Sequence, residues 1–316
     1  MPRVIRIAGV LVVIGFGGYA LWKGGRDLPV LPLDAPSFWL WLMLSFGLYL
    51  VSQVLAARAW AGTLAVFSIR LGGGRAETQL LVSQIGKYIP GNVAHLLGRL
   101  ALARADGVAG PVAGIAMLLE IGLVLAAGGL LFLVFLLVAP ELTLSLLPQE
   151  AGISLTGSSM LLAGLLAAGI GAGIWLLIRR VRRNSPMTRL EPAETAKPLA
   201  LHMVNFLALG LSLACVTQAI APVGNGAFLL SIPVFVVAWT IGFLMPGSPG
   251  GIGMREGLIA LGLGMTIGEG AALTAALLHR AICIMGDLTV FAVSYRCRQK
   301  IDMPEMVIRA RIRKCR

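Results

Sequence analysis

Long apolar runs separated by short polar interruptions follow one another along the whole chain. Many of these runs approach 20 residues, enough for a helix to cross a hydrocarbon core about 30 Å thick. Alternation of apolar and polar residues with period 2 is absent, which disfavours a transmembrane barrel. The pattern predicts helical spans near residues 4–22, 37–57, 109–138, 157–178, 199–221, 229–245, 252–268 and 271–295. We therefore expect an all-α polytopic membrane protein with about eight transmembrane helices.

Residues 77–100 are too interrupted by polar and helix-breaking residues to predict as a full span. This segment could enter and leave on one side of the membrane as a re-entrant hairpin. In that case one side of the membrane holds the amino terminus, the 179–198 loop and the carboxyl-terminal tail. If it crosses fully, the basic loop and tail lie opposite the basic amino terminus. The distribution of charge therefore favours a re-entrant segment.

Composition supports the membrane class and indicates which side is cytoplasmic. Hydrophobic residues make up 58% of the chain and charged residues 13%, against about 45–50% and about 25% in soluble domains. The net charge is +12, and 14 of the 26 Lys and Arg residues lie in 179–198 and 296–316. We interpret these pieces as a basic cytoplasmic loop and a basic cytoplasmic tail, with both termini cytoplasmic. Nucleic-acid binding is disfavoured, and no polar stretch is long enough for a soluble domain.

Two broken-helix motifs stand in the two halves of the chain, which predicts a two-fold internal repeat. They read KYIPGNVAHLLGR at 87–99 and PGSPGGIGMRE at 246–256, and in each an Arg follows the Gly of a Pro-Gly pair by eight residues. Proline breaks the helix, and the freed backbone groups are tolerated in lipid only when buried in protein or lining a wet cavity. Paired interruptions of this kind point to a transporter's binding site, where a restarted helix favours an anion. The alternative is a plain turn between two short helices.

Ionisable side chains in or beside the apolar segments are the candidates for the chemistry of such a site. They leave an excess of two positive charges, which suits a phosphate group. Glu120 stands alone in an apolar run and is predicted to be a counter-ion of Arg99 or Lys87, a proton carrier, or part of a structural salt bridge. Arg280 and Asp287 are seven residues apart and share a helix face. The cations are Arg58, Lys87, Arg99, Arg255 and Arg280, and the carboxylates are Glu120, Glu256 and Asp287.

The sequence predicts no metal site, no cofactor and no catalytic residue. His279 and Cys283 are four residues apart but lack a third ligand nearby, so we expect them to pack. We likewise interpret His95 as a hydrogen-bonded histidine and His202 as an ordinary packing position. The chain contains no C-x-x-C, no G-x-x-x-x-G-K-[ST], no G-x-S-x-G and no H-E-x-x-H sequence, so these routes to zinc, ATP or nucleophilic chemistry are not indicated.

The two motifs resemble the lysylphosphatidylglycerol synthase transmembrane-region family, whose members are described as flippase-like. KYIPGNVAHLLGR with the later ARADGV and Glu120 resembles its first signature, and MPGSPGGIGMREG with AALTAALLHR resembles its second, over roughly residues 5–295. Larger members continue into a soluble aminoacyl-transferase domain. Here the chain ends soon after Arg296, so we expect translocation of a lipid rather than lipid aminoacylation. By position, the resemblance assigns the site to Lys87, Pro90, Gly91, Arg99, Glu120, Pro246, Gly247, Gly251, Gly253, Arg255, Glu256 and Arg280, with Asn92 in a looser part of the first motif.

The expected protein is a single transmembrane flippase-like domain over 1–295, with repeat motifs near 87–120 and 246–280. It would move an anionic phospholipid or a polyprenyl-phosphate sugar across the bacterial inner membrane through a central basic cavity. One alternative is an integral-membrane glycosyltransferase that uses a polyprenyl-phosphate sugar, with Asp27 and Asp34 in the first outer loop as candidate carboxylates. The other is a non-catalytic membrane partner subunit.

Overall fold

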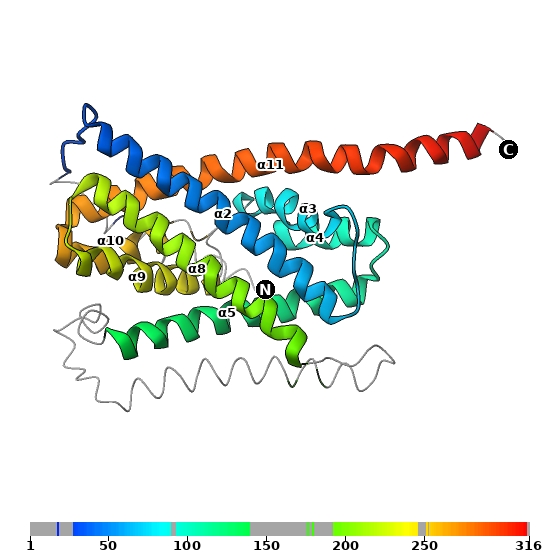
Figure 1. The fold of residues 1–316 in the computed structure, drawn as a ribbon, viewed down its shortest axis with the longest axis horizontal. Coiled ribbons are helices and arrows are strands. Elements are labelled where there is room, and N and C mark those ends of the chain that lie inside the picture. The colour runs from blue at the N-terminus through cyan, green and yellow to red at the C-terminus, as the bar shows by residue number, and fades with distance from the viewer. Residues whose placement is uncertain are drawn as a thin grey trace.

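The fold is entirely helical in the residues that the structure describes. This computed structural model describes residues 28–89, 93–139, 192–245, 251 and 253–314, besides single helical positions at 18, 176 and 179. No strand occurs among them, and the helices pack side by side into an elongated bundle from which the end of the last helix projects (Figure 1). The predicted all-α class is therefore confirmed for this part of the chain.

Four helices in the described residues are long and apolar enough to cross a membrane. They are α2 (Pro36–Val66), α5 (Gly110–Val138), α8 (Pro192–Ile220) and α11 (Glu269–Lys314). With 29 residues at about 1.5 Å per residue, α5 rises well beyond the roughly 30 Å of a hydrocarbon core. These helices indicate an integral membrane protein and correspond to the predicted spans 37–57, 109–138, 199–221 and 271–295.

The other predicted spans divide into two groups. The spans at 4–22 and 157–178 lie outside the described residues, save for single positions, so the count of eight stays a prediction. The spans at 229–245 and 252–268 correspond to α9 (Asn225–Leu244) and α10 (Met254–Ile267). With 14 residues, α10 is about 21 Å long, too short for a full crossing. The prediction of a full span at 252–268 is corrected accordingly.

Two helical hairpins carry the broken motifs. In the first, α3 (Arg75–Ser83) and η1 (Gln84–Tyr88) lead to the break, and α4 (Ala94–Ala105) follows it. In the second, α9 leads to the break and α10 follows it. The helices on the two sides of each break contact each other, and each hairpin continues directly into a long helix, α5 or α11. With 9 and 12 residues, α3 and α4 are too short to cross a membrane alone.

Close approach of helices depends on glycine at a few crossings. The longest shared interface is between α2 and α8, where Ser45 and Ser212 exchange hydrogen bonds of 2.8 and 2.9 Å to each other's carbonyl oxygens. A Cβ added at Gly210 of α8 would lie 2.7 Å from the Cα of Ile232 in α9. A Cβ at Gly286 of α11 would overlap the ring of Tyr49 in α2. Small residues allow such contacts in membrane helix bundles, where van der Waals packing drives association.

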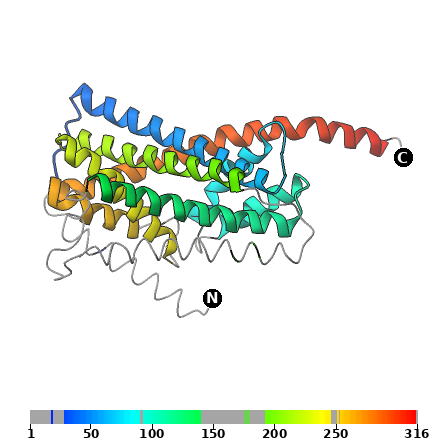
Figure 2. The same ribbon diagram turned by 60° about the horizontal axis from the view of Figure 1, so that its bottom comes forward.

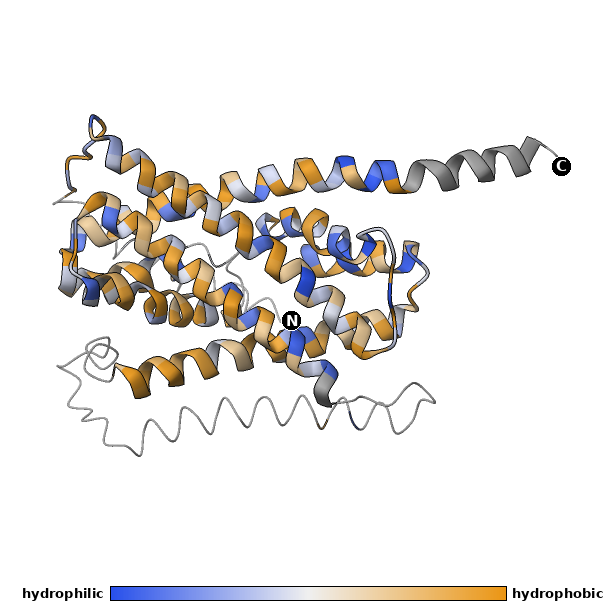
Figure 3. Ribbon diagram, in the orientation of Figure 1, coloured by the Kyte–Doolittle hydropathy of each residue, from blue (hydrophilic) through white to orange (hydrophobic). Residues whose placement is uncertain are grey.

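The short hairpin helices lie beside the long helices, α3 and α4 toward one end of the bundle and α9 and α10 toward the other (Figure 1). Seen from a second direction, α2, α8 and α5 run roughly alongside one another while α9 and α10 lie beside them (Figure 2). Hydrophobic residues dominate α5 and α9, whereas hydrophilic residues gather around α3, α4 and the neighbouring part of α11 (Figure 3). The buried apolar residues form two clusters, one built around α8 and α9 and one around α2, α3 and the start of α5.

Candidate functional site

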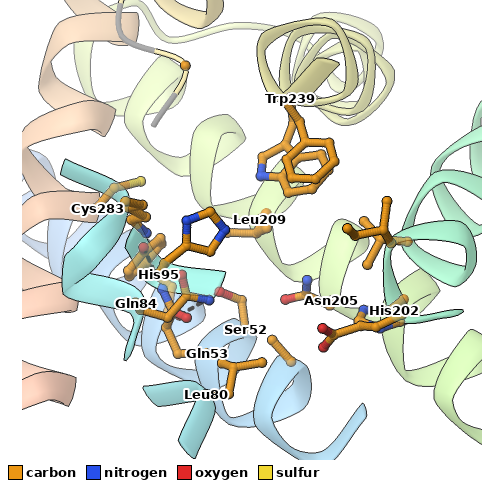
Figure 4. A pocket seen from close by; sticks show the side chains of 18 of the residues that line it. Ser52, Gln53, Leu80, Gln84, His95, His202, Asn205, Leu209, Trp239 and Cys283 are labelled. Carbon is orange, nitrogen blue, oxygen red and sulfur yellow. Dashed lines mark hydrogen bonds between the residues drawn. The ribbon is translucent and has the colours of Figure 1, made fainter. Parts of the chain in front are cut away.

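A cavity of about 160 Å³ lies among both hairpins and the long helices. Its wall includes Lys87 of η1, Arg99 of α4, Glu120 of α5, and Gly251 with Arg255 from the second hairpin. Figure 4 shows polar side chains from α2, α4 and α8 gathered around it, with Trp239 of α9 on one side. The fold therefore brings cations from both motifs to one space, although they are more than 150 residues apart in sequence.

Lys87 pairs with Asp287 at the end of the first hairpin. The Lys87 Nζ to Asp287 Oδ2 distance is 2.7 Å. The carboxylate, which is 3% exposed, also accepts hydrogen bonds from Tyr49 and Gln53 at 2.8 Å and from Tyr88 at 2.5 Å. These partners come from α2, η1 and α11, so the network attaches the hairpin to two long helices. A buried carboxylate with this many hydrogen-bond donors is well satisfied.

Arg99 forms an ion pair with Glu120. Of the two cations predicted as possible partners of Glu120, Arg99 and Lys87, it is therefore Arg99 that pairs with this carboxylate. Arg99 Nη1 contacts Glu120 Oε2, and the side chains are only 5% and 8% exposed. The guanidinium carbon also lies 4.9 Å from the centre of the Trp60 ring, within the range of a cation–π contact. Both charges line the cavity, so the pair is a buried ion pair facing an open space.

Arg280 and Glu256 lie beside the second break. Arg280 Nε is 3.6 Å from Glu256 Oε1. The other oxygen of Glu256 accepts a hydrogen bond of 2.6 Å from the backbone N–H of Gly253, at the start of α10. This carboxylate therefore caps a helix N-terminus as well as facing a cation. Arg280 and Asp287 share α11, as their spacing predicts, but they pair with different elements and neither belongs to the cavity wall.

Arg255 has a different environment from the other three cations. Its guanidinium carbon lies 5.9 Å from the ring centres of Phe235 and Trp239. Its Nε is buried without a hydrogen-bond partner, and no carboxylate pairs with it among the described residues. Gly251, with φ of +75°, leaves room beside it, because a Cβ there would lie 3.5 Å from Arg255 Nη2. Arg255 is thus a half-buried cation that lines a cavity, with a buried Nε and aromatic faces beside its guanidinium.

The net charge of the ionisable residues in and around the cavity is smaller than the sequence predicts. Arg58 lies elsewhere: its side chain is 66% exposed and its Nε is 3.4 Å from Glu77. Each of the three buried carboxylates faces a Lys or Arg, which leaves one positive charge at Arg255 rather than two. The predicted excess of two is therefore corrected, because one of the five cations faces away from the site.

Several predicted site residues lie outside the described part of the chain. These are Pro90, Gly91, Asn92, Pro246 and Gly247. Gly253 is described and has φ of +84°, a conformation that glycine adopts without strain, at the residue before α10.

Sequence reasoning missed much of the cavity wall. His95 and His202 both line the cavity, together with Gln53 and Asn205. Gln53 and Asn205 each carry an amide within an apolar run, which is costly in lipid, and this cost is the sequence feature that could have identified them. His279 and Cys283 do pack as expected: the ring lies 3.2 Å from Ser212 Oγ and 3.8 Å from Cys283 Sγ. Among the described residues, no group of three or more His, Cys, Asp or Glu could hold a metal ion.

A second polar cluster joins the first hairpin to α11 away from the cavity. Asp106, between α4 and α5, accepts hydrogen bonds from Arg298 at 2.5 and 2.8 Å, Arg75 at 3.0 Å and Gln79 at 2.6 Å. Burial favours a higher pKa for Asp106, but these donors outweigh it and hold the pKa below the ordinary value near 3.8. The cluster therefore stabilises the charged carboxylate and fastens three segments together.

Comparisons with protein-family models and with curated proteins found no relative of this chain. The resemblance to the flippase-like family thus rests on the two motifs alone.

Proposed function

We propose that the protein translocates an anionic lipid, a phospholipid or a polyprenyl-phosphate sugar, across the bacterial inner membrane. In this proposal the phosphate enters the cavity between the two hairpins while the hydrocarbon tail stays in the bilayer. Both termini face the cytoplasm, and the two broken motifs form an inverted repeat of re-entrant hairpins around the site. Both hairpins contribute to the cavity wall, which is the arrangement typical of transporters with paired broken helices.

The single observation that carries the proposal is Arg255. A buried guanidinium without a carboxylate is costly, because a charge at membrane depth needs a partner. Among the described residues, its side chain contacts the rings of Phe235 and Trp239 and lines the cavity, which supports an anion from outside the protein as its partner. A guanidinium donates two parallel hydrogen bonds to phosphate, which suits the headgroup of an anionic lipid.

The paired cations supply a second layer of charge near this site. Lys87 and Arg99 both line the cavity and each already faces a carboxylate. A phosphate beside Arg255 competes with Asp287 and Glu120 for these cations, so binding weakens the ion pairs that hold η1 and α4 to the long helices. Release of a hairpin in this way couples occupancy to opening of the site. Protonation of Glu120, Glu256 or Asp287 would have the same effect and would give a proton gradient a means of driving the cycle.

The proposal is tested in proteoliposomes that contain a fluorescent anionic lipid, by following its accessibility to a quencher on one side. Arg255→Gln is expected to slow translocation by about 10- to 100-fold, the loss that follows from hydrogen bonds to a charged group. Arg58→Gln is the matched control, because Arg58 is exposed and lies outside the cavity. Equal rates for wild type and Arg255→Gln, with the variant folded, would refute the assignment.

A further inference from the structure

We infer that the cavity contains a second subsite for a small hydroxyl-bearing group attached to the phosphate, formed by His95, His202 and Asn205. The inference rests on the proposed function, because it assigns the chemistry of the headgroup at the same site. It selects polyol or sugar substituents over an ammonium or a plain alkyl group.

These three side chains carry buried polar atoms without partners. His95 Nδ1, His202 Nε2 and Asn205 Oδ1 have no hydrogen-bond partner among the described residues, and all three residues line the cavity. His95 is 8% exposed and His202 is 2% exposed. An unpaired polar group at this depth is expensive, so a cavity that gathers three of them is built for a polar occupant.

The three groups come from two different walls. His202 and Asn205 are three residues apart on α8 and therefore share a helix face. His95 belongs to the first turn of α4, directly after the break in the first hairpin. Figure 4 shows His202 beside Asn205, with His95 reaching toward the cavity from the α4 side. A ligand group between them can be contacted from the hairpin and from a long helix at once.

Their hydrogen-bonding capacity matches a hydroxyl group. An uncharged imidazole offers one donor and one acceptor, and an Asn amide offers both in either orientation of its side chain. An ionised phosphate only accepts and an ammonium only donates, whereas a hydroxyl does both. A set of mixed donors and acceptors is therefore fully satisfied by hydroxyl groups and only partly by the other two.

The charges around the cavity exclude an ammonium group. Lys87, Arg99 and Arg255 all line it, and the carboxylate of Glu120 is already paired with Arg99. An ammonium would meet the positive charge of Arg255, which no described carboxylate pairs with, and the carboxylates of Glu120 and Asp287 already face Arg99 and Lys87. The volume of about 160 Å³ is close to the roughly 150 Å³ of a cavity that holds one benzene molecule. The hydroxylated part that enters is accordingly small, of a few carbon atoms.

The test compares lipids that differ only in the headgroup, with binding to the detergent-solubilised full chain measured by native mass spectrometry. Phosphatidylglycerol carries two hydroxyls on three carbons, and phosphatidylpropanol has the same carbons and charge without them. We expect wild type to bind phosphatidylglycerol with about tenfold higher affinity than phosphatidylpropanol. This is the difference expected when one buried hydrogen-bonding group stays unpaired in the phosphatidylpropanol complex. Asn205→Leu and His202→Phe should each reduce this preference, measured as the ratio of the two affinities, to below about threefold.

His279→Phe is the control, because His279 is as buried as His202 but is not part of the cavity wall. It should retain the full preference. Equal binding of the two lipids by wild type, an undiminished preference in Asn205→Leu, or tighter binding of phosphatidylethanolamine would each overturn the hydroxyl subsite. Failure of the proposed function is separate: Arg255→Gln would then leave the affinity for both lipids unchanged.

Discussion

The buried pair between Arg99 and Glu120 gives a sharp energetic prediction. Their side chains are 5% and 8% exposed, so removing one partner leaves an uncompensated charge away from water. Glu120→Leu or Arg99→Met alone is expected to lower the free energy of unfolding by about 3–5 kcal/mol. The double variant loses both charges and should cost much less than the sum of the two, with a coupling energy of about 2 kcal/mol or more.

The exposed pair between Arg58 and Glu77 is the internal reference for this cycle. Its side chains are 66% and 27% exposed, and water and salt screen it, so its coupling energy should lie below about 1 kcal/mol. The assay is equilibrium unfolding in mixed detergent micelles, with both double-mutant cycles measured in the same buffer. If the coupling energy of Arg99 with Glu120 is no larger than that of the reference pair, the cavity is wet enough to screen these charges and the reasoning fails.

Two further predictions concern helix packing and pH. Gly286→Ala should destabilise the protein by about 1–3 kcal/mol, because the added Cβ would overlap the ring of Tyr49. Gly47→Ala is the control and should change the stability little, because the space around Gly47 is open. Thermal unfolding of the two variants measures the difference. The lowered pKa of Asp106 contributes stability that is complete above about pH 4–5 and is lost as the pH falls through the folded-state pKa. Asp106→Asn should therefore unfold at a temperature that varies less between pH 6 and pH 3, and an unchanged pH dependence would count against the Arg298 contact.

The helical membrane class could be predicted from the sequence, because the length of an apolar run is a local property. The spans at 37–57 and 109–138 follow from run length alone. The shared Pro-Gly to Arg offset singled out Arg99 and Arg255, and both line one cavity although 156 positions separate them.

Pairing depends on tertiary structure and could not be predicted in the same way. Nothing local distinguishes Arg58, which faces outward, from Arg99, which is buried, since both lie in or beside apolar runs. Likewise His202 looks like a packing residue until the fold places α8 against α5, where His202 lines the cavity. The predicted span at 252–268 exceeds α10 at both ends, because Gly253 and Gly268, which flank the helix, continue the apolar pattern.

The most direct test of the central claim is a cryo-electron microscopy structure of the protein in nanodiscs that contain an anionic lipid. We expect headgroup density in the cavity, with phosphate oxygens about 2.7–2.9 Å from the guanidinium nitrogens of Arg255. The same density should be absent from a matched structure of Arg255→Gln. A cavity that contains only water, or an Arg255 that pairs with a carboxylate of the protein itself, would contradict the account.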